Sequence, residues 1–248
     1  MGTMEKRKEA VMTLGVIGGL GPMATAGFLE LVTQMTDAGT DQEHLNMIIY
    51  SAPGIPDRTA YILGQSGESP VGPMIDIGRK LCEQGADFIS IPCITAHYFH
   101  RELQESISVP IINAIYETGM EIQKNQIEKV GILATDGTIQ SRIFQNQLED
   151  MGMEVLVPGD TGQQYVMDII YKNVKAGKAI EVEKFRQVSR ELFSRGAQIL
   201  VLGCTELSSV KKEMQLREGY LDAMEVLAQR SVLRCNGKLR KEYENLVY

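Results

Sequence analysis

Two similar stretches dominate this sequence, GADFISIPCIT at residues 85–95 and GAQILVLGCTE at residues 196–206. Each begins with a Gly-Ala pair, continues as a short apolar run and reaches a cysteine eight positions after the glycine (93 − 85 = 8 and 204 − 196 = 8). A short apolar run bounded by turn residues is typical of a buried strand in a parallel sheet. Ligands of α/β proteins bind just beyond the carboxyl ends of such strands. The pattern therefore predicts one thiol, Cys93 or Cys204, at each of two equivalent strand ends.

The similarity extends to the segments that open each half of the chain. Residues 14–21 (LGVIGGLG) resemble residues 130–137 (VGILATDG), and the offsets are nearly equal, 131 − 15 = 116 for the glycines and 204 − 93 = 111 for the cysteines. Two homologous halves that face each other would bring both thiols to one cleft. Free cysteines are also common packing residues in protein cores. We favour the functional interpretation because both cysteines occupy the same place in the repeat.

This pattern predicts an α/β fold with two pseudo-symmetric domains, each with a mainly parallel sheet flanked by helices, and an active site in the cleft between them. We expect an extension at residues 1–12, a first domain at 13–113 together with 221–248, and a second domain at 114–220. Further strands are expected at about 13–17, 47–51, 109–113, 129–134 and 154–157. Helices are expected at about 23–36, 73–83, 116–124, 163–176 and 182–195, and along a tail from 221 to 248.

The composition narrows the class of protein. The chain has 248 residues, of which 44% are hydrophobic and 23% charged, and its net charge is -7. These values are ordinary for a globular protein, whereas nonspecific nucleic-acid binding requires a basic surface. No apolar run reaches the length of a membrane span, and residues 1–12 (MGTMEKRKEAVM) lack the apolar segment of a secretory signal. We therefore expect a cytoplasmic protein with reduced thiols and with no nucleic-acid or membrane partner.

Neither a metal nor a nicotinamide cofactor is indicated by the motifs. The four cysteines form no C-x-x-C pair and there are only three histidines, so the spacing gives no zinc site. The turn at residues 18–22 (GGLGP) departs from the pattern G-x-G-x-x-G, because Ala24 stands where the third glycine is required. Backbone N–H groups of a glycine turn can hold a carboxylate as well as a phosphate. The turn is therefore a candidate for binding an anionic group of a substrate.

Two further side chains are candidates for the site. Arg58 lies in a loop with two prolines, near the end of the expected strand 47–51, where its guanidinium can grip a carboxylate. The alternative is a solvated arginine paired with Asp57. His97 follows Cys93 by four positions, which is about one helical turn, so it can act as a base toward that thiol. The alternative is a histidine that only caps or packs.

Five motifs in this order resemble the aspartate/glutamate racemase family over roughly residues 13–235: GGLGP (18–22), PDRT (56–59), PCITAHYF (92–99), LATDGT (133–138) and GCTEL (203–207). The resemblance implies a cofactor-independent amino-acid racemase that forms a homodimer. It implies that Cys93 and Cys204 are the two catalytic cysteines. Substrate contacts are then expected from Gly19, Leu20, Arg58, Thr59, Ile94, Thr95, Thr135, Tyr165, Thr205 and Glu206, of which Thr95, Thr135 and Thr205 match groups that hold the α-carboxylate and α-amine, and Arg58 matches one that reads the side-chain carboxylate.

Three positions depart from the family pattern and bear on the substrate. Ala52 and Ile94 replace asparagines, and Tyr165 stands where aspartate-specific members tend to have a lysine. We expect an acidic amino acid as the substrate, with aspartate handled weakly and a longer or less acidic side chain preferred. A hydantoin racemase, a related isomerase and a racemase for a non-acidic amino acid are the alternatives. A decarboxylase needs only one thiol, and a non-catalytic binding protein needs none, so the thiol pair disfavours both.

Overall fold

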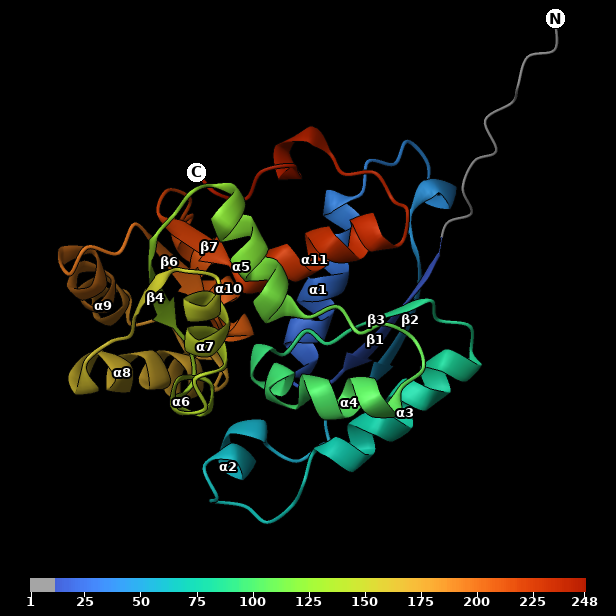
Figure 1. Cartoon of the computed structure of the whole chain (residues 1–248), viewed down its shortest axis with the longest axis horizontal. Helices are drawn as coiled ribbons and strands as arrows, with labels where there is room; N and C mark the ends of the chain where they lie inside the picture. The colour runs from blue at the N-terminus through green and yellow to red at the C-terminus, as the bar shows by residue number, and fades with distance from the viewer. Residues whose placement is uncertain (1–11) are drawn as a thin grey trace, which may run out of the picture.

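The computed structural model describes residues 12–248 and contains two parallel β-sheets flanked by helices (Figure 1). The first sheet has the order β2-β1-β3, made by β1 (Thr13–Gly18), β2 (Asn46–Ser51) and β3 (Phe88–Ser90). The second has the order β5-β4-β6-β7, made by β4 (Lys129–Leu133), β5 (Glu154–Leu156), β6 (Ile199–Leu202) and β7 (Tyr220–Asp222). The predicted α/β fold with two repeated parallel sheets is confirmed.

Helices connect the strands of each sheet. The first half contains α1 (Pro22–Met35), η1 (Asp41–Glu43), α2 (Arg58–Ile62), α3 (Val71–Glu83), η2 (Ile94–Phe99), α4 (His100–Ser106) and α5 (Ala114–Lys124). The second contains α6 (Asp136–Gln140), α7 (Ile143–Asp150), α8 (Asp160–Met167), the π-helix η3 (Asp168–Val174), α9 (Val182–Ser194), α10 (Thr205–Met214), α11 (Ala223–Arg234) and η4 (Lys241–Tyr243). No helix within residues 12–248 is both long and apolar enough to cross a lipid bilayer.

The two Gly-Ala pairs have the same structural role. Gly85 and Gly196 follow the ends of α3 and α9 with φ of 89° and 94°, in the left-handed region that favours glycine. The N–H of the following alanine donates to a carbonyl five residues back, Ala86 to Leu81 and Ala197 to Leu192. These bonds form the C-terminal motif that satisfies the last carbonyls of a helix. Each pair therefore ends a helix and leads the chain directly into the strand that precedes a cysteine, β3 before Cys93 and β6 before Cys204.

The prediction of a strand at residues 109–113 is wrong apart from one bridge. Ile111 forms an isolated parallel bridge with Ile89, at the edge of the first sheet that corresponds to β7 in the second. The bridge consists of the Ile89 N–H donating to the Pro110 carbonyl at 2.9 Å and the Ile112 N–H donating to the Ile89 carbonyl at 2.8 Å, whereas the N–H of Ile111 donates to Gln104. Pro110 has no N–H with which to extend the ladder. The pseudo-symmetry of the two sheets is complete in the central strands and incomplete at this edge.

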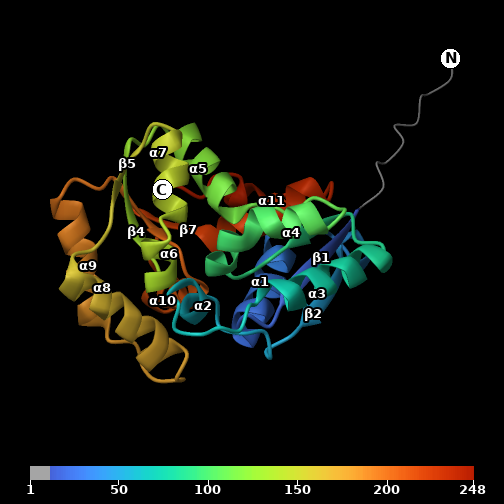
Figure 2. The same cartoon turned by 60° about the horizontal axis from the view of Figure 1, so that its bottom comes forward.

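The predicted helical tail differs from the structure at both of its ends. Leu221 belongs to β7, the helix α11 ends at Arg234, and the remaining residues form irregular structure and the short η4. β7 pairs with β6 of the second sheet, whereas α11 packs against both α1 and α5 (Figures 1 and 2). The domain boundaries expected above stay a prediction, and the expected extension lies outside the described residues except for Met12.

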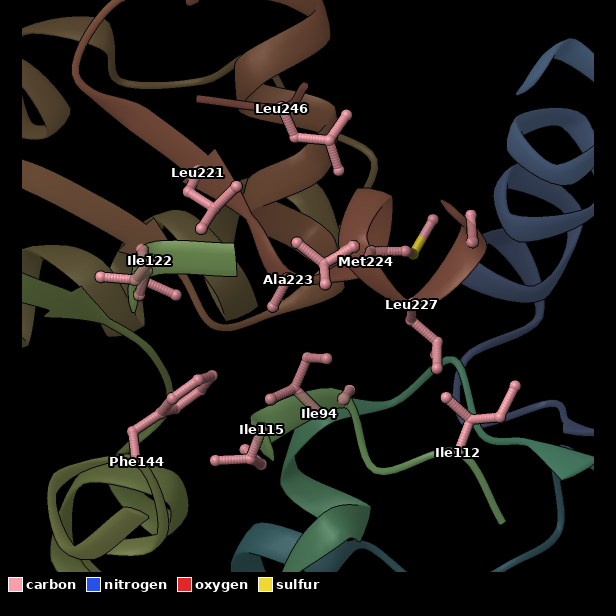
Figure 3. Packing of buried hydrophobic residues seen from close by; sticks show 14 of the residues in the cluster. Ile94, Ile112, Ile115, Ile122, Phe144, Leu221, Ala223, Met224, Leu227 and Leu246 are labelled. Atoms are coloured by element: carbon pink, nitrogen blue, oxygen red, sulfur yellow. The ribbon is translucent and has the colours of Figure 1, made fainter. Parts of the chain in front are cut away.

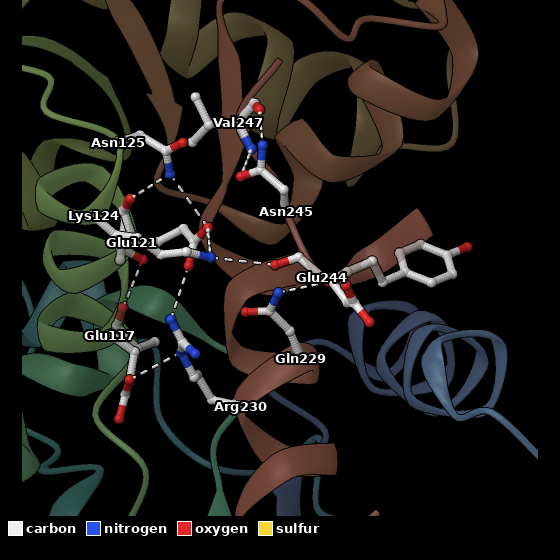
Figure 4. Close-up of polar contacts among 12 residues, drawn as sticks. Glu117, Glu121, Lys124, Asn125, Gln229, Arg230, Glu244, Asn245 and Val247 are labelled. Carbon is white, nitrogen blue, oxygen red and sulfur yellow. Dashed lines mark hydrogen bonds and ion pairs between the residues drawn. The ribbon is translucent and has the colours of Figure 1, made fainter. Parts of the chain in front are cut away.

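The helices α5 and α11 hold the two halves together. Each begins at a capping residue: Asn113, two residues after the bridge at Ile111, accepts hydrogen bonds from the first turn of α5, and Asp222, the last residue of β7, does so for α11. Arg230 on α11 lies 3.1 Å from the carboxylate of Glu117 and 2.9 Å from that of Glu121, both on α5 (Figure 4). These buried and half-buried ion pairs fix the position of one half relative to the other.

Apolar side chains from both halves form a shared core beneath the cleft. Ile94 and Ile115 belong to the same buried cluster as Phe144 and Leu227, and all four side chains are almost completely buried (Figure 3). Ile94 directly follows Cys93, so one face of the cleft is anchored in this core. Burial of an aliphatic or aromatic side chain stabilises a fold by about 1.5–3 kcal/mol. The core therefore fixes the backbone that carries the thiol.

Candidate active site

A small pocket lies between the two halves, at the carboxyl ends of their strands. It is lined by Leu20, Asp57, Arg58, Thr59, Cys93, Ile94, Thr95, Thr135, Tyr171, Lys175, Cys204, Thr205 and Glu206. Residues 20–95 of this set come from the first half and residues 135–206 from the second. Most of the contacts expected from the sequence are therefore brought together in one place, and both cysteines are among them.

The two thiols occupy equivalent positions in the fold. Cys93 comes three residues after the end of β3 and Cys204 two residues after the end of β6. Each is the residue immediately before a helical segment, with similar extended backbone angles (φ −151°, ψ 101° for Cys93 and φ −148°, ψ 136° for Cys204). Their exposed fractions are also similar, 7% and 6%. The repeat seen in the sequence is thus a repeat of local geometry at the pocket.

Threonine hydroxyls link the halves across the pocket. Thr59 donates to Thr135 at 3.3 Å, and Thr95 lies 3.1 Å from Thr135 and 3.0 Å from Thr138, as measured between Oγ1 atoms. The absence of a side chain at Gly137 permits this approach, because a Cβ there would lie 3.0 Å from the Cα of Thr59. Hydroxyl groups rotate to donate or accept. The cluster can therefore reorient toward a carboxylate or an amine in the pocket.

Arg58 is a buried cation whose charge has no acidic partner among residues 12–248. Its Nη1 donates to the carbonyls of Ile55 and Pro56, its Nη2 donates to that of Leu20, and its Nε has no partner. Its exposed fraction is 8%, and Asp57 instead caps α2 by accepting from the N–H of Ala60. The alternative of a solvated arginine paired with Asp57 is therefore wrong. A buried charge is costly unless it is paired, so this guanidinium favours an anion in the pocket.

The environments of the two thiols differ in charge. The Sγ of Cys204 donates to Oε2 of Glu206 at 2.8 Å, and Lys175 Nζ lies 3.8 Å from Oε1 of the same carboxylate. Burial raises the pKa of Cys204 well above its ordinary value, and the charge of Glu206 raises it further, while Lys175 opposes the rise. At the position equivalent to Glu206, two residues after Cys93, the first half has the neutral Thr95. The two strand ends therefore have similar backbones but differ in side-chain charge, because only the second has a carboxylate beside its thiol.

Three of the predicted residues do not reach the pocket. The N–H of Gly19 donates to Thr25 Oγ1 at 2.8 Å, so it is already satisfied inside the turn. Tyr165 packs in the second half, where the ammonium of Lys184 lies 5.5 Å from its ring centroid. The ring of His97 lies within 3.2 Å of the Ile91 carbonyl, and burial, followed by the nearby His100, lowers the pKa of His97 to about 3. His97 is thus a packing residue.

The sequence analysis missed Tyr171 and Lys175 and treated Asp57 only as a partner of Arg58. Tyr171 and Lys175 line the pocket from η3 and from the residue just after it. Their spacing of four residues, inside a helix expected at 163–176, would have placed them on one face. Burial alone would lower the pKa of Lys175, but attraction to Glu206, Tyr171, Cys204 and Asp57 raises it above its ordinary value. Lys175 therefore supplies a cation to the pocket, whereas position 165, at which aspartate-specific members of the family tend to have a lysine, lies outside the pocket.

A second hollow adjoins the first. It shares Asp57, Thr59 and Tyr171 with the thiol pocket and is otherwise lined by Ala60, Leu63, Gln65, Asp136 and Met167. Its walls come from α2 and the residues just after it, from α6 and from the α8–η3 segment, and α2 and α6 contact each other (Figure 2). The thiol pocket therefore has room for a longer group on the side of Tyr171.

Comparison with known proteins identifies the family. The family described as Asp/Glu/Hydantoin racemase matches residues 17–230. The broad specificity amino-acid racemase RacX of Bacillus subtilis is 31% identical over 225 residues, which cover 88% of this chain and 96% of RacX. An aspartate racemase structure from Picrophilus torridus is 30% identical, with a TM-score of 0.80 and coverage of 94% of this chain and 97% of that one.

A further structure shows the same fold at greater distance. An aspartate racemase homologue from Pyrococcus horikoshii superposes with a TM-score of 0.75 at 23% identity, over 92% of this chain and 100% of that one. The family match covers more than half of the chain, and it includes both thiol strand ends and the residues that line the pocket between them. The chain therefore belongs to the Asp/Glu/Hydantoin racemase family and is an isomerase.

Proposed function

We propose that this isomerase racemises an amino acid without a cofactor, with Cys93 and Cys204 acting as the acid/base pair on opposite faces of Cα. The observation that carries the proposal is the equivalent placement of the two thiols at strand ends that line one pocket from its two sides. The similarity to RacX and to the Picrophilus torridus aspartate racemase supports an amino acid as the substrate.

The chemistry requires one thiol in each protonation state. The thiolate takes the α-proton, so that an S–H bond forms as the C–H bond breaks, and the electron pair is delocalised into the α-carboxylate. The opposite thiol then gives its proton to the other face of Cα and becomes the thiolate. Fixed donors around the carboxylate stabilise the charge that develops there. Thr95, Thr135 and Thr205 supply such donors from both halves.

An acidic side chain fits the charges of the pocket. Arg58 offers a buried Nε without a partner, and Lys175 adds a second cation at the pocket. The adjoining hollow beyond Tyr171 favours a side chain longer than that of aspartate. Ala52 and Ile94 remove the two amides expected in the family, which reduces the hydrogen bonds available to a short side chain. Glutamate is therefore the first candidate, ahead of aspartate.

A hydantoin or a related cyclic substrate is the second candidate. The family includes hydantoin racemases, and the apolar Leu20 and Ile94 at the pocket suit a substrate with fewer charges. The same thiol pair would invert a hydantoin carbon. The buried, unpaired charge of Arg58 favours the amino acid, because a neutral ring would leave that charge uncompensated.

The test is a panel of L-amino acids and one 5-substituted hydantoin in deuterated water, followed by proton NMR for loss of the Cα signal and by chiral chromatography. We expect exchange with inversion for at least one amino acid, with glutamate ahead of aspartate. Exchange for the hydantoin alone would support the second candidate. No exchange with any member of the panel would contradict racemisation of a free amino acid.

The homodimer and the cytoplasmic location stay predictions. The family resemblance supports the dimer, and the four cysteines, all unpaired in the structure, suit a reducing compartment. Light scattering after size-exclusion chromatography distinguishes a dimer of this 27.5 kDa chain from a monomer.

A further inference from the structure

The asymmetry between the two thiols is the feature that the proposed function leaves unexplained. In a two-thiol racemase each thiol acts in turn as acid and as base, yet of the two thiols only Cys204 donates a hydrogen bond to a carboxylate, that of Glu206 at 2.8 Å. The side chain of Glu206 is 11% exposed, so water screens its charge only weakly. The equivalent residue beside Cys93 is Thr95, whose hydroxyl is engaged with Thr135 and Thr138.

We propose that Glu206 is a positioning residue that holds the proton on Cys204, so that the free enzyme rests with Cys204 as the acid and Cys93 as the base. The inference rests on the proposed function for its catalytic meaning, although the protonation asymmetry itself can be measured without turnover. A thiolate at Cys204 would lie beside a carboxylate in a weakly hydrated pocket, and this like-charge contact disfavours it. Glu206 therefore biases which thiol carries the proton.

Lys175 limits this bias. Its Nζ lies 3.8 Å from Oε1 of Glu206, and its side chain is 32% exposed at the mouth of the pocket. Partial neutralisation of Glu206 lets Cys204 become a thiolate during turnover, after it has given its proton to Cα. The distance is long and the lysine is partly solvated, so its effect is smaller than that of Glu206 and opposite in sign.

The other charged or titratable groups around Cys204 stay constant in the test. They are Tyr171 from η3, Asp57 and Arg58 from the start of α2, and Cys93 from the facing strand end. The side chain that accepts the hydrogen bond of the Cys204 thiol is that of Glu206. Substitution of Glu206 by glutamine removes the charge of this acceptor and leaves the backbone N–H of residue 206 beside the thiol.

Kinetic direction cannot reveal the bias, because the two enantiomers have equal free energy and kcat/KM must be equal in both directions. The readout is instead the alkylation rate of each cysteine by iodoacetamide, followed by mass spectrometry of the two peptides between pH 6 and 9. The reagent is neutral, so charge changes do not alter its recruitment. The exposed fractions of the two residues are 7% and 6%, which gives the reagent similar access to both.

In the natural enzyme we expect Cys93 to be alkylated faster than Cys204 at neutral pH. In Glu206→Gln, whose amide oxygen can still accept the S–H, we expect alkylation of Cys204 to rise by about three- to tenfold relative to Cys93. A lower pKa raises the thiolate fraction of Cys204, and the gain in rate is smaller than the gain in thiolate because a more acidic thiol gives a less nucleophilic thiolate. In Lys175→Met the same ratio should fall about two- to threefold.

The controls are Glu213→Gln, an exposed residue on the same helix α10, and Lys178→Met, an exposed residue just after η3. Neither should change the ratio, and loosening of the fold would raise both rates together. A ratio in Glu206→Gln within twofold of the natural enzyme would overturn the inference. A shifted ratio in a chain that exchanges no α-proton would leave the inference standing and contradict the proposed function instead.

Discussion

Substitution of Lys175 by methionine tests whether this residue, rather than residue 165, reads the side-chain carboxylate of the substrate. The structure places Lys175 at the thiol pocket and Tyr165 outside it, next to Lys184. Methionine keeps most of the apolar stem and removes the ammonium. We therefore expect Lys175→Met to lower the preference for an acidic side chain.

The magnitude follows from the exposure of the lysine. A hydrogen bond to a charged group contributes about 1.5–3 kcal/mol. Because the Lys175 side chain is 32% exposed and also faces Glu206, we discount this contribution to about 1–2 kcal/mol. A loss of this size corresponds to roughly a five- to thirtyfold change in specificity.

The assay is the ratio of kcat/KM for glutamate to that for glutamine, which has the same shape without the charge. The ratio cancels any effect of Lys175 on the acidity of Cys204, because that effect is common to both substrates. Lys178→Met is the matched control and should leave the ratio unchanged. Tyr165→Lys should change it less than threefold. An unchanged ratio in Lys175→Met, or a large gain in Tyr165→Lys, would refute this assignment.

Three further predictions concern stability, geometry and cofactors. Burial, followed by the charge of Glu225, raises the pKa of Asp222 to about 7 from 3.8, so the unfolded chain loses this proton first and stability falls as pH rises from about 4 to 7. Asp222→Asn keeps an oxygen that accepts from Ser208 and Met224, and it should remove a loss of about 2–3 kcal/mol between pH 5 and pH 8, as measured by urea unfolding; an equal loss in both proteins would contradict this. Gly137→Ala places a Cβ 3.0 Å from the Cα of Thr59, so kcat/KM should fall on the order of tenfold to a hundredfold with little change in Tm, and full activity would show that this close approach is dispensable. Dialysis against a chelator should leave racemisation intact, whereas loss of activity that added metal restores would refute the cofactor-free chemistry.

The thiol strand ends were predictable because every signal for them is local. A Gly-Ala helix end, a short apolar run and a cysteine follow one another within eleven residues, and Gly85 and Gly196 do adopt the same left-handed turn. Arg58 was also placed correctly beside the strand ends, although it begins the short helix α2 and does not lie in the expected loop. Its burial was not predictable, because the three carbonyls that hold its guanidinium include that of Leu20, 38 positions away.

The remaining errors come from tertiary context. The strand expected at 109–113 is reduced to one bridge because Pro110 has no N–H to continue the ladder, and the helical tail begins as β7 because β6 offers it a free edge. Lys175 was missed because the family pattern directed attention to position 165, while η3 brings a residue ten positions later to the pocket. Glu206 was expected at the substrate, and only the structure reveals its contact with Cys204.

The most direct test of the two-thiol chemistry uses Cys93→Ser and Cys204→Ser with each enantiomer of the best substrate in deuterated water. A serine hydroxyl is too weak an acid to act as the base at neutral pH, so we expect both variants to lose racemisation. We also expect one of them to retain exchange of the α-proton, with retention of configuration, from one enantiomer only, because the remaining thiol faces one side of Cα. Racemisation at a near-natural rate in either variant would contradict the account.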